Sequence, residues 1–417
     1  MFLISIFWLD FRYLRDMKFL KFTFLLLSVL VFGQKIKSVQ LFNPQTNDET
    51  PVIKFGEQLV LNFDDLENKS TVYRYTFKHF DRNWKDDGLF FTEYAKGPVN
   101  SYIQDFRYSF NTVQKYTHYT LKFPNEKTQL KISGNYEIIV FDESVNKPLF
   151  KKRFCVVENG ANLGINVTRF ADSKAQNLNQ RIEVSATSNQ ASLFSNLNSI
   201  SLNVIQNNNF GLGIYNQKPN AAMGNKLLFQ QMNLVFPGNN EFYYFDNKNM
   251  NQPFDMVAAT NNNDEGNHTY LHSVWAFPLN YQYQPDVNGA FYFRRNDLGI
   301  ERNADTEADY SWVYFSLDSE KTEKEIYVLG AFNDFIPSEE NKMSYDENAK
   351  KYVARIYLKQ GFYNYILATK DASGFINLGE INGNFWQTEN LYQAFLYYAP
   401  FDRNYDGLIG YGETRKR

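Results

Sequence analysis

The sequence has few of the residues on which disulfide and metal chemistry depend. Its 417 residues include one cysteine, Cys155, and four histidines. A single cysteine excludes an intramolecular disulfide. Cys155 lies in the strand-like stretch KKRFCVVE, and the sequence pattern places no base beside it. We therefore interpret Cys155 as a buried, unreactive thiol and not as a nucleophile.

The sequence also has little excess of one sign of charge and few long apolar runs. The formal net charge is −3 and the pI is near 5.9, which gives no electrostatic case for nucleic acid as a partner. The mean hydropathy is −0.49, and no apolar run after residue 33 is long enough to span a bilayer. We therefore predict no helical transmembrane segment in the mature chain.

Familiar catalytic and cofactor motifs are missing as well. The sequence has no glycine-rich phosphate loop, no G-x-S-x-G elbow and no H-E-x-x-H pair. The carboxylates Asp305, Glu307 and Asp309 in NADTEADYSW are better explained as a solvated link between domains than as an acid–base pair. We predict that the protein is not an enzyme and needs no cofactor.

The amino-terminal residues have the layout of a secretory signal. The stretch MKFLKFTFLLLSVLVFGQ begins at Met17 with two lysines, continues with an apolar segment and ends with Gly33 before Gln34. A membrane anchor is the alternative, for which the apolar segment is short. We predict a signal peptide at 17–33, a mis-assigned start at 1–16, and an exported, periplasmic protein. No cysteine follows the apolar segment, which excludes a bacterial lipoprotein anchor.

Aromatic residues are what the sequence has in abundance. It contains 39 Phe and 29 Tyr, and aromatics make up 18% of the chain. Such side chains fit the pleated, half-buried surface of a β-sheet. Short strand-like stretches recur throughout, separated by Gly, Asn, Asp and Pro, which is typical of β-sandwiches. We predict an all-β fold of consecutive immunoglobulin-like sandwiches at 34–157, 158–308 and 309–417.

The stretch TVYRYTFKHFDRNWKDD at 71–87 combines many aromatics with many charges. Tyr73, Tyr75 and Phe77 fall on one face of an extended chain, and the residues between them fall on the other. We expect the first face to be core. The loop that follows ends in Trp84, which is placed either to pack against the protein or to meet a partner.

Two further patterns are candidates for metal ligands. His268 and His272 in NHTYLHS are four residues apart, but no cysteine or third histidine accompanies them, so we predict no metal there. The stretch DRNYDGLIGYGE matches a calcium loop through the following residues: Asp402, Asn404, Asp406, Gly407 and Glu413. An EF-hand needs flanking helices, whereas a strand-like stretch precedes this loop and too few residues follow it. We interpret it as a turn between the last two strands.

Part of the third segment resembles the glycogen- and starch-binding β-sandwich modules. The resemblance lies in IYVLGAFNDFIPSEENKMSYDENAKKYVARIYLKQGFYNYI, which has a strand, a G-x-F-N-x-aromatic turn, a Met after a loop and a G-x-Y hairpin. In those modules Trp stacks on sugar rings. Here the corresponding aromatic is Phe335, which is less suited to stacking. The likeness supports the fold more than a ligand.

The chain as a whole resembles the type IX secretion plug proteins of Bacteroidetes, formerly a domain of unknown function. The resemblance runs in order through about 39–411, and no single motif carries it. It rests on the following stretches: YRYTFKHFDRNW, DFRYSFNTVQKYTHYTLKFPN, SGNYEIIVFD, GNNEFYYFDN, DVNGAFYFRRN, TEADYSWVYFSL, VLGAFNDF, LKQGFYNY and YDGLIGY.

This resemblance implies a function. Members of the plug family are similar to one another in binding the outer-membrane translocon of the type IX system from the periplasmic side and closing its pore. We take Trp84 and Arg294 as candidate partner-binding residues, because large aromatics and arginines dominate the energetics of interfaces. The alternative from another class is a periplasmic or surface glycan-binding protein.

Overall fold

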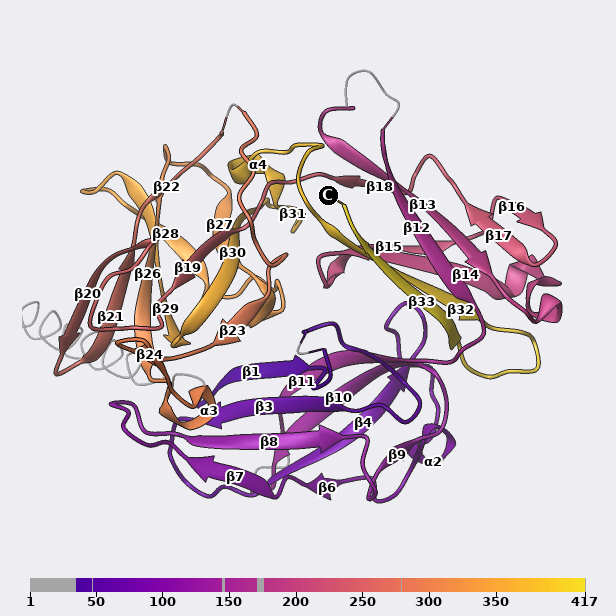
Figure 1. Ribbon diagram of the computed structural model, residues 1–417, viewed down its shortest axis with the longest axis horizontal. Coiled ribbons are helices and arrows are strands. Elements are labelled where there is room, and N and C mark those ends of the chain that lie inside the picture. The colour runs from indigo at the N-terminus through magenta and orange to yellow at the C-terminus, as the bar shows by residue number, and fades with distance from the viewer. Residues whose placement is uncertain (1–34, 47, 145–146, 171–175, 279, 417) are drawn as a thin grey trace, which may run out of the picture.

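The chain folds into three β-rich units that meet at a common junction (Figure 1). The computed structural model describes residues 35–46, 48–144, 147–170, 176–278 and 280–416. The predicted signal peptide at 17–33 and the segment 1–16 lie outside these residues. The elements are strands with a few short helical turns, so the predicted all-β fold is confirmed. No helix within the described residues is long and apolar enough to cross a membrane.

The first unit is a sandwich of two sheets. One sheet contains, in spatial order, β1 (Ile36–Phe42), β3 (Leu59–Asp65), β8 (Thr117–Phe123) and β7 (Asp105–Tyr108). The other contains β2 (Val52–Lys54), β11 (Lys147–Val157), β10 (Gly134–Asp142), β4 (Tyr73–Phe80) and β6 (Ser101–Tyr102). A short pair, β5 (Ala95–Lys96) with β9 (Gln129–Leu130), follows helix α2 (Phe91–Tyr94).

The core of the first unit is built from the aromatic residues that the sequence alternates. In β4, Tyr73, Tyr75 and Phe77 are buried and the residues between them are partly exposed, as predicted. In the facing sheet, the rings of Phe63 on β3 and Tyr119 on β8 stack as cross-strand neighbours, with centroids 5.0 Å apart. Each buried Tyr brings a hydroxyl that needs a partner. Tyr73, for example, donates to Asp65 Oδ2 at 2.8 Å.

The second unit combines strands from two distant parts of the chain. One sheet contains β12 (Asn162–Arg169), β13 (Asn179–Thr187), β17 (Lys226–Phe229) and β16 (Ala221–Met223), with β18 (Val235–Pro237) also on β13. The other contains β15 (Asn209–Gln217), β14 (Ile200–Gln206), β32 (Leu391–Tyr398) and β33 (Gly407–Arg415). Two 3₁₀ turns, η1 (Ala191–Phe194) and η2 (Leu197–Ser199), precede β14.

The pairing of β32 with β14 differs from the predicted contiguous segments 158–308 and 309–417. Ile200 lies opposite Tyr398, and the register runs antiparallel to Gln206 opposite Tyr392. The physical reason is burial on both faces. One face of β32 packs in the second unit's core, and its other face packs toward the first unit. A sheet position covered on both sides suits a strand that is apolar throughout.

The third unit lies between the strands of the second in chain order. Its extended sheet contains, in spatial order, β19 (Tyr243–Asp246), β30 (Gly361–Lys370), β27 (Glu325–Leu329), β28 (Lys342–Asp346), β29 (Lys351–Lys359), β26 (Tyr310–Asp318), β21 (Gly266–Leu271) and β20 (Val257–Asn263). β22 (Val274–Trp275) pairs with β26, and β23 (Phe291–Phe293) and β31 (Ile376–Asn377) pair with β30. The remaining elements are β24 (Asn296–Asp297), β25 (Ile300–Glu301), α3 (Ala304–Glu307), η3 (Ala331–Asn333) and α4 (Gly379–Asn382).

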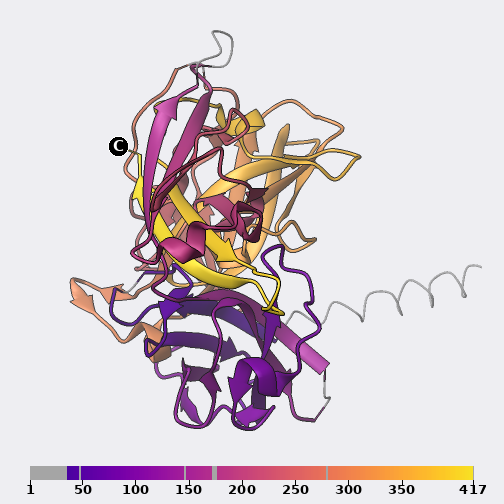
Figure 2. The ribbon, with the colours of Figure 1, turned by 90° about the vertical axis from the view of Figure 1, so that its right-hand side faces the viewer.

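The three units form a triangle when viewed as in Figure 1. The first unit, in indigo and purple, lies below the other two, and Figure 2 shows the same relation from the side. The yellow carboxy-terminal strands β32 and β33 lie on the second unit's face toward the first. The chain therefore buries side chains at three interfaces between units as well as inside each unit.

Candidate functional site

The contact between the first and third units contains a buried ion pair. Asp64 on β3 and Lys359 on β29 are 0% and 1% exposed at their side chains, and Lys359 Nζ lies 2.8 Å from Asp64 Oδ2. The Tyr310 hydroxyl donates to the same oxygen at 2.7 Å. His118 Nδ1 lies 2.7 Å from Asp64 Oδ1. One carboxylate of the first unit therefore has three polar partners, two of which come from the third unit.

The electrostatics of this cluster favour a charged Asp64. Burial by itself would raise the carboxyl pKa, but Lys359 and His118 outweigh that effect and lower it below its ordinary value. Lys359 Nζ also donates to the Asp305 carbonyl at 3.0 Å and lies 4.4 Å from the centre of the Tyr116 ring. A buried charge is tolerated only when it is paired and hydrogen-bonded, so this pair requires the two units to be docked.

A second polar cluster, around Asp309, joins the same two units. The Asp309 carboxylate accepts the backbone N–H groups of Val113 and Gln114, the latter at 3.0 Å. Its own backbone N–H donates to Gln360 Oε1 at 2.9 Å. The sequence interpretation of Asp309 as part of a solvated link is wrong, because the residue is buried. It binds a loop of the first unit to the third.

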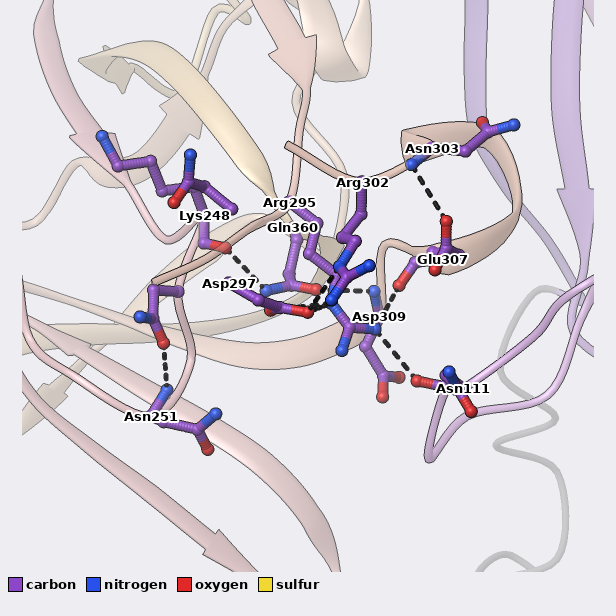
Figure 3. Close-up of polar contacts among 12 residues, drawn as sticks. Asn111, Lys248, Asn251, Arg295, Asp297, Arg302, Asn303, Glu307, Asp309 and Gln360 are labelled. Atoms are coloured by element: carbon purple, nitrogen blue, oxygen red, sulfur yellow. Dashed lines mark hydrogen bonds and ion pairs between the residues drawn. The ribbon is translucent and has the colours of Figure 1, made fainter. Parts of the chain in front are cut away.

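Arg295 extends this cluster, as Figure 3 shows. Its guanidinium donates to the Asn111 carbonyl at 2.9 Å and to the Glu307 carbonyl at 2.6 Å. Asp297 holds the other side of the guanidinium, with Nε at 3.1 Å from Oδ1. An arginine fixed by a carboxylate in this way is a preorganised donor for carbonyl groups. Here those carbonyls belong to the first and third units.

Trp84, a predicted partner-binding residue, packs between the first and second units. Its ring lies 5.1 Å from that of Phe210 at a near-perpendicular angle, and the Arg153 guanidinium lies 4.6 Å from its centre. Its φ of 61° is unusual for a bulky residue and aims the side chain at this contact. Buried Cys155 belongs to the same apolar cluster, and burial raises the pKa of its thiol. Whether Trp84 also contacts a partner stays a prediction.

Polar contacts accompany the apolar cluster between the first and second units. The Tyr397 hydroxyl of β32 donates to Asn135 Oδ1 at 2.8 Å. Asn203 of β14 donates from its amide to the Arg82 carbonyl at 2.7 Å. These bonds connect the two central strands of the second unit to the first unit.

Asn and Gln side chains hold the two stretches of chain that connect the second and third units, 238–242 and 383–390. Asn390 donates to the Gly238 carbonyl at 2.8 Å and to Gln180 Oε1 at 3.2 Å. Asn239 donates to Gln206 Oε1 at 3.1 Å. These amides account for part of the Asn and Gln enrichment of the middle segment. They satisfy backbone groups that loops would otherwise bury unpaired.

Arg294, the other predicted partner-binding residue, lies at the surface of the third unit. Its guanidinium is 3.0 Å from Glu301 and 3.5 Å from Asp246, and its side chain is partly exposed. The backbone N–H donates to the Gln360 carbonyl at 3.1 Å. The structure therefore leaves the side chain accessible while two carboxylates neutralise it. A role in partner binding stays a prediction.

The residues of the calcium-loop match have separate partners. Asp406 accepts the Arg82 backbone N–H at 2.9 Å, and Asn404 donates to Glu93 at 3.1 Å. Glu413 lies on β33, where it accepts from the Tyr411 hydroxyl, and Asp402 lies in the preceding turn. Among the described residues, no group of three or more His, Cys, Asp or Glu side chains is arranged to hold a metal. The loop instead joins β33 to the first unit.

The histidines fall in structural positions. His268 Nδ1 lies 3.0 Å from the Tyr314 hydroxyl, and His272 is exposed. His79 pairs with Asp87, and its Nε2 lies 3.2 Å from the Ser133 carbonyl. Both ring nitrogens of His79 therefore have partners, and the partner of His268 Nδ1 is a tyrosine and not a second histidine.

Phe335, which stands where carbohydrate modules carry a stacking aromatic, is buried. It is 7% exposed and packs 6.2 Å from the Phe242 ring. Asn333 shapes the turn before it by accepting the Gly330 N–H at 3.0 Å and donating to the Val328 carbonyl at 2.9 Å. The G-x-F-N-x-aromatic pattern therefore builds a turn and fills the core, and Phe335 presents no face for a sugar.

Sequence analysis missed the residues that join the units most strongly. Asp64, Lys359 and Tyr310 are far apart in the chain, and nothing local marks them as partners. One signal was available, because Asp64 and Lys359 each end an apolar strand stretch, QLVLNF and VARIYL. A charge that continues a buried strand needs a buried partner.

Comparison with known proteins supports the predicted resemblance. Residues 36–158 match the family described as "Type 9 secretion system plug protein 1st domain". The predicted resemblance to the plug family is therefore confirmed for residues 36–158, which are those of the first unit. No curated protein matches the chain.

A solved structure is similar to nearly the whole chain. It is described as the crystal structure of a hypothetical protein from Parabacteroides merdae ATCC 43184 at 2.30 Å resolution. It is 28% identical, with a TM-score of 0.87, over 92% of this chain and 98% of that chain. A Pseudomonas fluorescens alkylpurine DNA glycosylase AlkC bound to DNA containing an abasic site analog is 13% identical over 29% of this chain and 30% of that one. Its TM-score of 0.18 carries no argument.

Proposed function

From the match of residues 36–158 to the first domain of the type 9 secretion system plug proteins, we propose that this protein is a non-enzymatic plug subunit. In this proposal it is exported to the periplasm, binds the outer-membrane translocon of the type IX system and seals its periplasmic opening. The family match is the observation that carries the proposal. At its coarser level, the match indicates a role related to type IX secretion.

The physical support comes from the junctions. A seal for a wide aqueous channel has to be a preformed body, because a flexible segment would lose much conformational entropy on binding. Here the first and third units share the buried Asp64–Lys359 pair and the Asp309 cluster. The first and second units share an apolar cluster with Trp84 at its margin. Such contacts favour one fixed arrangement of the three units.

The test combines a deletion with a binding measurement. Deleting the gene in its host should increase outer-membrane leakiness to bulky antibiotics and leave secretion largely intact. The purified translocon should bind the purified protein. Arg294→Glu should weaken that binding and lower the melting temperature slightly, because the new carboxylate repels Glu301 and Asp246. Trp84→Ala should weaken binding and also loosen the contact between the first and second units. A deletion strain as impermeable as its parent, together with a translocon that has no affinity for the protein, would contradict the proposal.

The same experiment weighs the glycan-binding alternative. Retention of the protein on polysaccharide beads, with no translocon bound, would favour a carbohydrate partner. Burial of Phe335 counts against the stacking mode of the carbohydrate modules at that position. The plug function is therefore the better supported of the two.

A further inference from the structure

The outer edge of the first unit is an open strand. β7 (Asp105–Tyr108) ends its sheet, and β8 is the strand that pairs with it in the part of the chain that the structure describes. All four of its residues are exposed. Figure 1 shows β7 at the lower margin of the first unit, on the side away from the other two units. An edge of this kind presents unpaired backbone donors and acceptors to solvent.

The ladder with β8 determines which backbone groups are free. Ser109 N–H donates to the Tyr116 carbonyl at 2.9 Å, directly after the registered pair Tyr108 and Thr117. Residues in an antiparallel ladder alternate between hydrogen-bonded and non-hydrogen-bonded pairs. Arg107 therefore points its N–H and carbonyl toward β8, and Phe106 and Tyr108 point theirs outward.

The next outward group in the same row already binds a backbone acceptor. Phe110 N–H donates to the Thr306 carbonyl of the third unit at 2.8 Å. Of the backbone groups that point away from β8, the Phe110 N–H is therefore already used in a contact within the protein. The groups of Tyr108 and Phe106 continue the same edge and face solvent. A further strand laid on this edge would extend an interface that the fold has begun.

The side chains on this edge are aromatic where polar ones would be expected. Phe106 and Tyr108 are 40% and 51% exposed, and their rings lie 5.9 Å apart. Phe106 also lies 5.7 Å from the core ring of Tyr119, so the edge continues the sandwich core into solvent. Natural proteins often protect an open edge with lysine, proline or a bulge, and β7 has none of these, so its protection is limited to its short length and the charges of Asp105 and Arg107.

The opposite sheet is open on the same side. Strand β6 (Ser101–Tyr102) ends that sheet, and two residues separate it from β7. Tyr102 is exposed, and its hydroxyl donates to Glu143 at 3.0 Å. The two edge strands therefore border one open side of the sandwich, where the rings of Tyr102, Phe106 and Tyr108 are exposed.

We propose that β7 is the docking edge for an extended segment of the translocon, which adds to the sheet as a further strand. The outward N–H and carbonyl groups of Phe106 and Tyr108 can form ladder hydrogen bonds only with a partner whose backbone is extended. The exposed rings select apolar side chains at alternate positions of that segment. Asp105 and Arg107 carry opposite charges, so the selection rests on backbone pairing and apolar contact. This inference rests on the proposed plug function and names the surface through which it acts.

A pair of variants at Tyr108 separates backbone pairing from side-chain contact. Tyr108→Ala removes the ring and keeps the outward N–H, whereas Tyr108→Pro removes both. Because that N–H points away from β8, neither change breaks the ladder, and proline is tolerated at such edge positions. Phe90→Ala, at another exposed ring of the first unit, is the matched control. Melting temperatures of all three should stay within a few degrees of the parent.

The measurement is binding of the purified translocon, with amide hydrogen exchange in the free and bound protein. Tyr108→Pro should bind about tenfold more weakly than Tyr108→Ala, because a partner carbonyl loses its donor. Phe90→Ala should bind like the parent. The amides of Phe106 and Tyr108, which point away from β8, should exchange quickly in the free protein and become protected in the complex.

The outcomes separate this inference from the function on which it rests. Full binding by Tyr108→Pro, and no added protection of the Phe106 and Tyr108 amides when the parent protein is bound, would overturn the docking edge and leave the plug function standing. No binding of the parent protein would overturn both. A parent dimer that Tyr108→Pro dissociates, with translocon binding unchanged, would assign the edge to a second copy of the chain and refute the proposed occupant.

Discussion

Removing the buried lysine tests whether the first and third units act as one body. Lys359→Met keeps most of the side-chain volume and removes the charge that lies 2.8 Å from Asp64 Oδ2. Breaking a buried ion pair from one side typically costs about 3–5 kcal/mol, because the remaining charge is left in a dry site. Asp64 keeps His118 and Tyr310 as partners. We therefore expect Lys359→Met to lower the free energy of unfolding by about 3 kcal/mol, which is near the lower end of that range.

The assay is urea unfolding combined with amide hydrogen exchange of β3 and β8. The parent should unfold in one cooperative transition, and Lys359→Met should unfold at a lower urea concentration. In the variant, the amides of the first unit should exchange before those of the other two units. A double-mutant cycle with Asp64→Asn should give a coupling energy of about 2 kcal/mol. Lys321→Met is the control, because its partner Glu347 is exposed. A coupling energy near zero, or a Lys359→Met protein as stable as the control, would refute the reasoning.

Three further predictions concern single groups. Cys155 is buried and its thiol pKa is raised, so a thiol reagent should leave the native protein unmodified and react after unfolding; rapid native labelling would contradict this. Burial raises the Glu49 pKa from 4.5 to about 8, so its contribution to stability is present below pH 4.5 and lost as the pH rises through about 8. Glu49→Gln should flatten the stability profile between these pH values, and urea midpoints that fall as steeply as the parent's would count against it. Thermal melts with calcium and with chelator should superimpose, and a rise of several degrees with calcium that Asp402→Ala abolishes would show a bound ion.

How much of the fold the sequence predicts depends on the range of the interaction. The alternation of Tyr73, Tyr75 and Phe77 is local, and period 2 suffices to predict a strand with one buried face. The calcium-loop match could also be weighed locally, from the strand before it and the few residues after it. In each case the deciding information lies within one or two elements.

Contacts between the units could not be predicted in the same way. Asp64 and Lys359 are separated by 295 positions, and either charge alone would fit a solvent-exposed strand end. Trp84 was recognised as an unusual aromatic, but its surroundings come from β15 and β11, so packing and partner binding could not be told apart. Asp309 was taken as solvated because its neighbours are acidic. The loop of residues 113–114 that buries it is almost 200 positions away.

The return of β32 and β33 to the second unit has a consequence for how the protein can be assembled. β14 needs β32 as its neighbour, and nearly the whole third unit lies between them in the chain. The second unit therefore cannot be completed until the third has been synthesised, so β32 and β33 are the last strands to join the molecule. A chain cut at residue 390 would keep an intact first unit and an open second one. Loss of a few carboxy-terminal strands would thus disable two interfaces at once, those that β32 makes with β14 and with the first unit.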